Sequence, residues 1–413
     1  MTNELLPLEG IRVFDLSQGV AGPYCTMMLA AQGADVIKVE PFEGDWIRSG
    51  RNQYRGHSSA SITVNMGKRS IALDLKDPQA LEAAKKIAAG CDIILESFRP
   101  GVVSKLGLDY ETLAKDRPEL IYASISGYGQ TGPLAQRGVV DQIMQACSGW
   151  MVLNAGVDGV PHRTRNVVLA DQITGLYSSQ ALCAALIRQF RHGRGTRLDI
   201  SLMGAMAAFL SSRITAHVMS GGEPGSMYFT APTGEYSTSD GILTLAARNP
   251  SEFEKFCCAA DRADLLDDPR FSTPAARAQY VKELDVEVTR ALSTRSASEW
   301  ETLLNSKGVM ASVVRTVGDF IETEQMLAQG FLQTLDLEGI GDCPVVQLPG
   351  APAWSSRTAS PCVPVVGQHG VEILCEAGYS DLAIDGLLAQ GCLRVPKLDA
   401  DSRRKRKELI HGH

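Results

Sequence analysis

The sequence predicts an α/β protein with a large domain of mainly parallel strands and a smaller α+β domain. Short runs of strand length alternate with helix-length segments over residues 11–200, and such alternation is typical of a parallel sheet covered by helices. The pattern stops at residues 220–225, which are rich in glycine and read as a linker. A hairpin and several helices are predicted beyond it. The 413 residues leave room for two or three domains.

The first βαβ unit of the large domain is predicted within residues 11–40. Residues 11–16 read as a buried parallel strand. A helix over residues 24–32 and a strand over residues 35–40 follow. The loop at residues 17–23 is small and leads into a helix N-terminus, so it would receive a phosphate or the extended arm of a cofactor. Its glycine spacing does not match a dinucleotide fingerprint.

The strand–helix alternation continues along the large domain. Its further predicted strands span residues 71–75, 92–96, 120–126 and 198–200, and its predicted helices residues 77–89, 141–149, 172–192 and 203–214. Asp77 and Pro78 start one of these helices by the cap-then-proline rule. Residues 44–67 are polar and predicted to be irregular, and Arg48 and His57 there would face either an anion or solvent.

A literal GxGxxG occurs at residues 127–132, directly after a predicted strand. Pro133 follows at once, no clear second strand comes after it, and no strand-end acid lies about twenty residues on. A nicotinamide site is therefore not expected. A flexible glycine turn that lines a pocket is the preferred interpretation.

The segment after the linker has a different pattern. Its predicted elements are a hairpin at residues 234–237 and 243–247, helices at 251–259, 274–292 and 298–307, and a short strand at 310–314. Strand-like pieces and helices at 370–377 and 382–390 come next, before a basic tail at 403–407. The predicted boundaries are residues 1–220, 224–333 and 334–413.

The composition narrows the expected partners. A formal charge of −7 does not favour nucleic acid. No apolar run reaches the length of a membrane span, and the N-terminus does not begin a secretory signal. The ten cysteines lack CxxC or Cys/His spacing, so no metal site is expected. Free thiols in a reducing cytoplasm are the expected state.

Residues 168–175 contain the strongest candidate for catalysis. Asp171 stands where an extended segment meets a long apolar helix, so it is expected to cap that helix and to stay ionised at its positive end. With Gly175 clearing space beside it, an ionised carboxylate there would be a nucleophile. The alternative is that Asp171 only caps the helix. Arg163 or Arg165, just upstream, would clamp a substrate carboxylate or lie on the surface.

In these motifs the chain resembles the class III CoA-transferases, the formyl-CoA/carnitine-CoA transferase (CaiB/BaiF) group. The resemblance covers residues 8–393 and rests on LSQxxAGP at 16–23, GADVIKVE at 33–40, GKRSI at 67–71, SFRPG at 97–101, GYGQTGP at 127–133, ADxxxG at 170–175, GxG at 193–195 before LDIS at 198–201, DPRF at 268–271 and GQH at 367–369. It implies a Rossmann-like large domain built from the N- and C-terminal segments, a smaller domain, and two chains interlocked as rings in a homodimer.

The resemblance also implies the chemistry. The aspartate matching Asp171 attacks an acyl-CoA, forms an aspartyl anhydride and then an aspartyl-CoA thioester, and passes CoA to a free acid. Small acids, dicarboxylates among them, are expected because Arg163, Arg165 and Arg48 lie near the motifs. Coenzyme A enters as the acyl-CoA substrate. The CoA contacts that carry over are Gly19, Val20 and Ala21 beside the pantetheine, Leu73, Lys76, Ser97, Phe98, Arg99 and Lys105 around the nucleotide, and Arg137 at a more loosely aligned position.

The chain departs from the family at two places. Pro41 stands where some members carry an arginine for the nucleotide phosphates, and the multi-glycine loop of the formyl-CoA enzyme is replaced by residues 248–250. Two other functions stay open. A 2-methylacyl-CoA racemase of the same superfamily would need a His-Asp pair where Val140 and Asp141 stand, and valine cannot move a proton. A non-catalytic CoA-thioester-binding protein would not need Asp171.

Overall fold

The computed structural model describes residues 6–50, 53–55, 57–155, 159–222, 230–356 and 361–396. The basic tail and part of the predicted linker lie outside these residues. The chain divides into two compact units. The first joins Met1–Ile214 with Phe331–His413, and the second is Thr215–Gly330.

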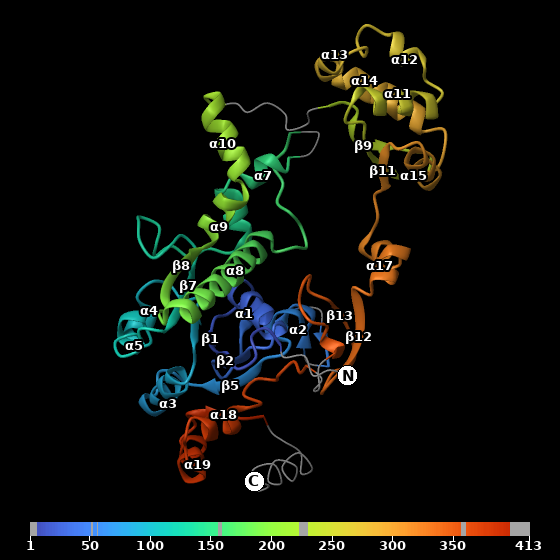
Figure 1. The fold of residues 1–413 in the computed structure, drawn as a ribbon. Coiled ribbons are helices and arrows are strands. Elements are labelled where there is room, and N and C mark those ends of the chain that lie inside the picture. The colour runs from blue at the N-terminus through green and yellow to red at the C-terminus, as the bar shows by residue number, and fades with distance from the viewer. Residues whose placement is uncertain are drawn as a thin grey trace. The chain divides into compact units, whose positions relative to one another are not determined.

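The first unit is built on a mainly parallel sheet (Figure 1). Within the described residues its seven strands run in the order β14-β5-β2-β1-β6-β7-β8. Their bounds are β1 Arg12–Leu16, β2 Asp35–Glu40, β5 Arg69–Leu73, β6 Ile93–Glu96, β7 Ile121–Ser126, β8 Thr196–Ser201 and β14 Leu393–Arg394. Apart from β14, which pairs antiparallel with β5, the chain order across the sheet is 3-2-1-4-5-6, that of a Rossmann-like fold.

Helices cover both faces of this sheet. The helices of the first unit include α1 Ala21–Ala31, α2 Ser59–Asn65, α3 Pro78–Ala89, α4 Val102–Leu106, α5 Tyr110–Leu113, α6 Asp141–Cys147, α7 Trp150–Leu153, α8 Leu169–His192, α9 Leu202–Phe209, α18 Gly370–Glu376 and α19 Asp381–Ala389. The apolar core on one face includes side chains of α1, α8 and α9. The core on the other includes side chains of α3, α18 and α19. Because both faces are covered, β6 and β7 are buried along their whole length.

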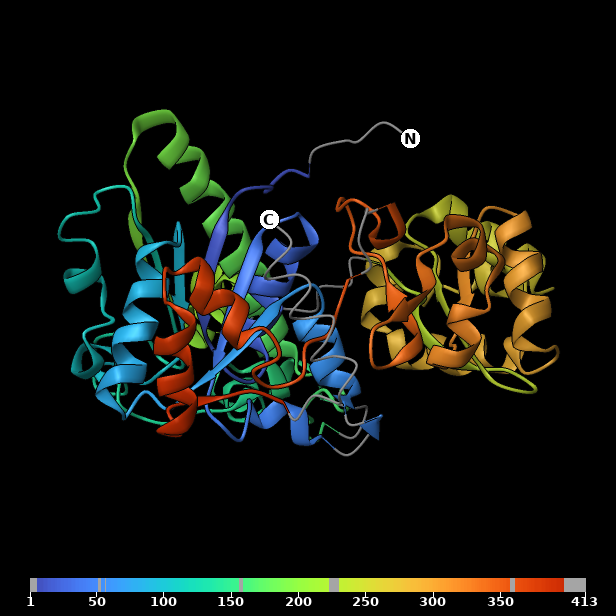
Figure 2. The ribbon, with the colours of Figure 1, turned by 90° about the horizontal axis from the view of Figure 1, so that it is seen from below.

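The C-terminal segment returns to the sheet formed by the N-terminal segment, as Figures 1 and 2 show. Leu393 in β14 lies opposite Leu73 in β5. On α18, Glu376 forms ion pairs with Arg12 and Arg69, at 2.8 Å and 2.6 Å. Both ends of the chain therefore contribute to the first unit.

The prediction that residues 44–67 are irregular is wrong. They include the short helix η1 (Trp46–Ser49), the strands β3 (Gln53–Tyr54) and β4 (His57–Ser58), and α2. Ser58 caps α2 through its hydroxyl, which accepts from the Ser61 N–H at 3.0 Å. Ile62 is buried in a core shared with the hairpin β12 (Leu332–Leu337) and β13 (Gly341–Val346). Tertiary packing thus stabilises a helix too short and polar to be recognised by its periodicity.

The second unit has a three-stranded antiparallel sheet in the order β11-β10-β9, with β9 Thr233–Ser237, β10 Ile242–Ala246 and β11 Met310–Val313. The predicted hairpin is confirmed by the pairing of β9 with β10. The helices are α11 Pro250–Ala259, α12 Asp264–Asp267, α13 Pro274–Gln279, α14 Val281–Leu292, α15 Ala297–Ser306, α16 Val317–Ile321 and α17 Glu324–Gln329. The predicted helix at 274–292 is interrupted at Tyr280.

The predicted helix at residues 203–214 is also interrupted. Leu210 ends α9, and α10 (Ser211–Ser220) begins at the next residue. In the described part of the chain, none of the individual helices combines the length and hydropathy needed to cross a membrane, although α9 and α10, bent against each other, pass that test as a pair.

Candidate active site

A large cavity of the first unit lies at the carboxyl ends of the parallel strands. Its volume is about 870 Å³. It is lined by the loops that follow β1, β6 and β7 and by the first turn of α8. Between β1 and β6 the strand order reverses direction, and open α/β sheets bind ligands at this switch point. As predicted, the glycine turn after β7 contributes to the lining, through Gly127.

Buried charges hold the loop between β1 and α1. Asp45 accepts a hydrogen bond from the Gly19 N–H at 3.0 Å and another from the Lys38 ammonium at 2.9 Å. The Lys68 ammonium donates to Asp15 at 3.0 Å. Burial opposes ionisation of Asp15, but Lys68 and Lys38 together lower its pKa to about 2. The loop is therefore anchored from beneath by fixed ion pairs.

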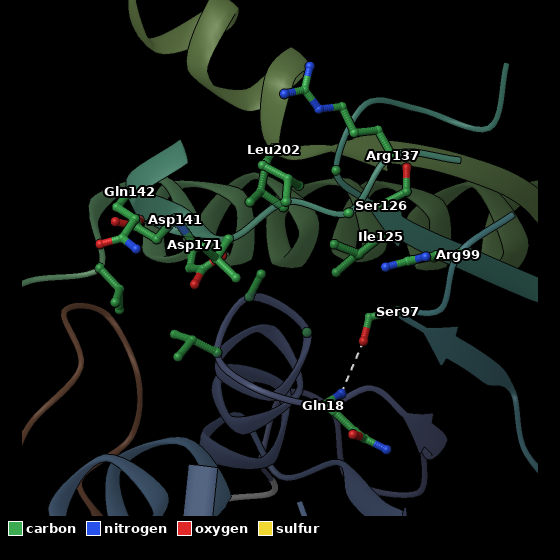
Figure 3. Close-up of a pocket in the computed structure, with 18 of the residues that line it drawn as sticks. Gln18, Ser97, Arg99, Ile125, Ser126, Arg137, Asp141, Gln142, Asp171 and Leu202 are labelled. Atoms are coloured by element: carbon green, nitrogen blue, oxygen red, sulfur yellow. Dashed lines mark hydrogen bonds between the residues drawn. The ribbon is translucent and has the colours of Figure 1, made fainter. Parts of the chain in front are cut away.

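A second contact ties this loop to the end of β6. The Gln18 N–H donates to the Ser97 hydroxyl at 3.0 Å (Figure 3). The Phe98 N–H donates to the buried Glu96 carboxylate at 2.8 Å. Arg99 packs against Gly138, where a Cβ would lie 2.8 Å from its guanidinium. The cavity walls after β1 and β6 thus hold each other in place.

Asp171 lies in the first turn of α8, but it does not cap the helix as predicted. The helix begins at Leu169, and Val168 is the N-cap residue without a side-chain hydrogen bond. The capping acceptor is Asp141 of α6, whose Oδ1 accepts from the Ala170 N–H at 2.6 Å and from the Asp171 N–H at 3.2 Å. Figure 3 shows the two carboxylates side by side on the cavity wall.

The prediction that the helix end keeps Asp171 ionised is also wrong. Burial and the neighbouring Asp141 raise the pKa of Asp171 to about 7. Among the described residues, no hydrogen bond or ion pair reaches the Asp171 side chain. The carboxylate is half-buried, lines the cavity and carries a high proton affinity, which are properties of a reactive group.

Gly175 allows α8 to approach α1 closely. A Cβ at Gly175 would lie 2.8 Å from the Ala21 carbonyl oxygen and 3.0 Å from the Tyr24 ring. The space that Gly175 clears is therefore filled by α1. This contact places Ala21, itself in the cavity wall, against the turn that follows Asp171.

Most of the predicted site residues meet at two neighbouring hollows. The larger cavity is lined by Val20, Ala21, Ser97, Phe98, Arg99, Arg137 and Asp171. A second cavity of about 370 Å³, beyond the ends of β2 and β5, is lined by Leu73, Lys76 and Phe98. Gly19 does not line the larger cavity, but it packs against Trp46, which does. Lys105 on α4 is exposed and lines neither cavity.

The three arginines expected near the substrate acid have different environments. The Arg48 guanidinium donates twice to Glu40, at 2.7 Å each, and is not available to a ligand. Arg165 is exposed and outside the cavity lining. Arg163 lines the cavity and donates to the Gln142 side chain at 2.5 Å.

Sequence reasoning missed several polar residues of the cavity wall. They are Gln18, Gln142, Thr164 and Asn166. Gln18 belongs to the LSQ motif and had that signal, whereas the others lie in loops without a local pattern. Among the described residues, no group of three or more His, Cys, Asp or Glu side chains has the arrangement of a metal site.

A Rossmann-like sheet with a cavity at its switch point is typical of a ligand-binding α/β protein, and the comparisons show the family. The model of CoA-transferase family III matches residues 8–370, and the chain belongs to this family. It is 35% identical over 407 residues to succinyl-CoA:glutarate CoA-transferase of Mus musculus, covering 95% of this chain and 91% of that protein.

A bacterial relative and a solved structure agree with this membership. The chain is 34% identical over 396 residues to succinate–glutarate CoA-transferase of Agrobacterium fabrum, with 91% and 97% of the two chains covered. The crystal structure of a CaiB/BaiF family protein from Brucella suis matches with a TM-score of 0.80 and 32% identity, over 91% of this chain and all of that one. The protein is a CoA-transferase that moves CoA from an acyl-CoA donor to a free carboxylic acid.

Proposed function

We propose that the protein transfers CoA between small carboxylic acids through covalent intermediates on Asp171. The observation that carries this proposal is the half-buried Asp171 carboxyl in the cavity, with no hydrogen-bond partner among the described residues. A carboxylate already paired to an arginine would be a weak nucleophile. This one keeps both oxygens available for an incoming carbonyl carbon.

The reaction balances through two intermediates. An Asp171 oxygen attacks the thioester carbonyl, the C–S bond breaks, and CoA leaves as the thiolate while a mixed anhydride forms. The thiolate then attacks the aspartyl carbonyl, which releases the donor acid and leaves an aspartyl-CoA thioester. The acceptor carboxylate displaces the thiolate in the same manner, and attack of the thiolate on the acceptor acyl group regenerates Asp171.

The CoA-binding domain, with predicted limits of residues 1–220 and 334–413, supplies the binding energy for these uphill steps. In this proposal the pantetheine runs along Gly19, Val20 and Ala21. The nucleotide extends toward the second cavity and contacts Leu73, Lys76, Ser97, Phe98 and Arg99, with Lys105 and Arg137 reaching the phosphates from the rim. Water must be excluded because an exposed anhydride hydrolyses.

The acceptor is proposed to be a small dicarboxylic acid. Arg163 lines the same cavity as Asp171 and is engaged only by the neutral Gln142 among the contacts of the described residues. A guanidinium there would bind the distal carboxylate in a bidentate manner while the proximal one reacts. Two relatives carry names that refer to succinyl-CoA or succinate and to glutarate.

We further propose an interlocked homodimer in the cytoplasm. Large apolar side chains are exposed on α8 and α9, namely Leu176, Ile187, Phe190, Met203 and Phe209. An apolar face of this size marks an interaction surface, and a second copy of the chain would cover it. All ten cysteines are free, in keeping with a reducing compartment.

The test is to trap the acyl-enzyme. Hydroxylamine added during turnover would convert the aspartyl anhydride or thioester to a hydroxamate, and peptide mass analysis would place it on Asp171. Asp171→Asn, treated identically, is the control and should show neither hydroxamate nor transfer. An unmodified Asp171 peptide under active turnover would sink the proposal.

The same preparation distinguishes the other functions. A racemase would exchange the α-proton of a 2-methylacyl-CoA in D₂O, but Val140 in the cavity wall offers no titratable group for that exchange. We expect no exchange. Binding of acyl-CoA without any transfer to an acid panel would instead indicate a non-catalytic binding protein.

A further inference from the structure

Asp141 stands at the first position of α6 and is almost completely buried, with 7% of its surface exposed. Its Oδ1 accepts from two N–H groups in the first turn of α8, those of Ala170 and Asp171. Its Oδ2 accepts from the Gln145 side-chain amide at 2.6 Å. Both carboxylate oxygens are thus bound to donors, as a buried charge requires.

The contact extends from Asp141 into the loop that carries Arg163. Gln145 is fully buried, and its Oε1 accepts from the Thr164 N–H at 2.8 Å. The Thr164 hydroxyl in turn accepts from the Trp150 indole N–H at 2.9 Å. Because the Gln145 oxygen faces an N–H and its nitrogen faces a carboxylate, its amide can adopt only one orientation. The chain Asp141–Gln145–Thr164 therefore locks three segments of the cavity wall together.

This arrangement deprives Asp171 of the stabilisation that a first-turn carboxylate normally receives. Free N–H groups and the positive helix end stabilise a negative charge at that place. Here the N–H groups are occupied and a second negative charge lies against the same helix end. The Asp171 carboxylate gains little from its helix and meets a like charge instead.

Resting on the proposed nucleophilic function of Asp171, we propose that Asp141 is the positioning residue of the transfer reaction. It fixes the first turn of α8 by occupying its backbone donors, and its negative charge keeps the adjacent carboxylate strongly nucleophilic. The benefit lies in how the tetrahedral intermediate breaks down. It expels whichever group is the weaker base. An ordinary aspartate, with a pKa of about 3.9, would leave far more readily than a thiolate, whose thiol has a pKa of about 8.5.

A more basic carboxylate narrows the difference in leaving-group ability between Asp171 and the thiolate. Attack by Asp171 then proceeds more often to the anhydride and less often back to the thioester. The other charged groups of the cavity wall are Arg99, Arg137 and Arg163. From α1, packed against α8, come Tyr24 and the buried Cys25, and burial raises the pKa of each, so both are neutral. Among the described residues of the wall, Asp141 is thus the one carboxylate beside Asp171.

The test moves the charge without breaking the hydrogen bonds. The double variant combines Asp141→Asn with Gln145→Glu. The new amide oxygen at position 141 would still accept from both helix N–H groups. The amide nitrogen there would donate to the new carboxylate at position 145, which would still accept from the Thr164 N–H. The network is conserved, and the negative charge lies one hydrogen bond farther from Asp171. Thermal unfolding would check that the fold is retained.

The measurement is the pH profile of kcat/KM for CoA transfer. The pH at which kcat/KM falls on the acidic side, here called the acidic limb, reports the pKa of the essential base in the free enzyme. In the wild type it is expected near pH 7, from the pKa of Asp171. In the double variant we expect the acidic limb at least about one pH unit lower. At pH values above the limb, we expect kcat to be reduced about three- to tenfold. Loss of rate with an unmoved limb would overturn the inference, because it would mean a purely structural role.

Asp171→Asn in the same assay separates the two proposals. If this variant still transfers CoA, the proposed function itself fails. If it is inactive while the double variant retains the wild-type limb and rate, the nucleophile stands and only the role of Asp141 is refuted.

Discussion

Replacing Asp171 by asparagine removes one titratable group from the start of α8, and its effect on stability does not depend on any substrate. In the folded protein, burial and Asp141 raise the pKa of Asp171 from 3.8 to about 7. A raised pKa means that the fold favours the protonated form. The stability contributed by that form is complete below the unfolded pKa and is lost as pH rises through the folded pKa.

The size of the loss follows from the shift. At about 1.4 kcal/mol per pKa unit, a rise from 3.8 to about 7 corresponds to at most ~4 kcal/mol between pH 4 and pH 8. Asparagine has nearly the same shape and does not ionise. Asp171→Asn should therefore be more stable than the wild type at about pH 8, and the two should converge toward about pH 4.

The assay is thermal unfolding of both proteins across this range. Asp77→Asn is a matched control with the opposite sign, because Asp77 caps α3 and hydrogen bonds from the Ala80 and Gln79 N–H groups lower its pKa. That variant should lose stability relative to the wild type as pH rises. A difference between wild type and Asp171→Asn that is the same at both ends of the range would refute the reasoning about the site.

Three further predictions address the cavity wall. Arg163→Met should raise KM for a dicarboxylic acceptor at least ~tenfold, with less change in KM for a monocarboxylic acid. Arg165→Met, outside the cavity lining, should leave both KM values unchanged. Steady-state kinetics with matched dicarboxylic and monocarboxylic acids measures these values. Gly175→Ala would place a methyl group 2.8 Å from the Ala21 oxygen and should lower the free energy of unfolding by ~1–3 kcal/mol. Gly386→Ala, where α19 has open space, should raise that free energy by ~0.5–1 kcal/mol. Chemical denaturation measures both values. Asp45→Leu would leave the buried Lys38 ammonium without its carboxylate and should lower stability by ~3–5 kcal/mol, visible as a lower unfolding temperature.

The parallel strands could be predicted because each is a short apolar run with turn signals beside it. The strand expected at residues 35–40 is β2 with the same bounds, and the one expected at 92–96 is β6 less one residue. The irregular prediction for residues 44–67 failed because α2 is only seven residues long and gains its stability from Ile62 in a core shared with a distant hairpin. Local pattern does not contain that information.

The parts of the candidate site that sequence motifs specify could be predicted. The parts that depend on tertiary contacts could not. Asp171 could be singled out from its place between an extended segment and an apolar helix. An aspartate there resembles a cap, but the actual acceptor is Asp141, 30 residues away along the chain. The pairing of Arg48 with Glu40 likewise depends on where β2 ends relative to η1. The Asp141 contact changes the expected ionisation of Asp171, and the Glu40 contact removes Arg48 from the expected substrate contacts. Neither effect follows from sequence neighbours alone.

Two buried carboxylates, Asp45 and Asp141, have similar roles around the cavity wall. Asp45 takes the Gly19 N–H beneath the β1–α1 loop, and Asp141 takes the first N–H groups of α8. Backbone donors that would otherwise attract a substrate carboxylate or weaken the nucleophile are thereby occupied. Positive charge in the wall comes instead from Arg99, Arg137 and Arg163, on loops. The positive charge of the wall is thus carried by loop side chains and not by the helix end beside Asp171.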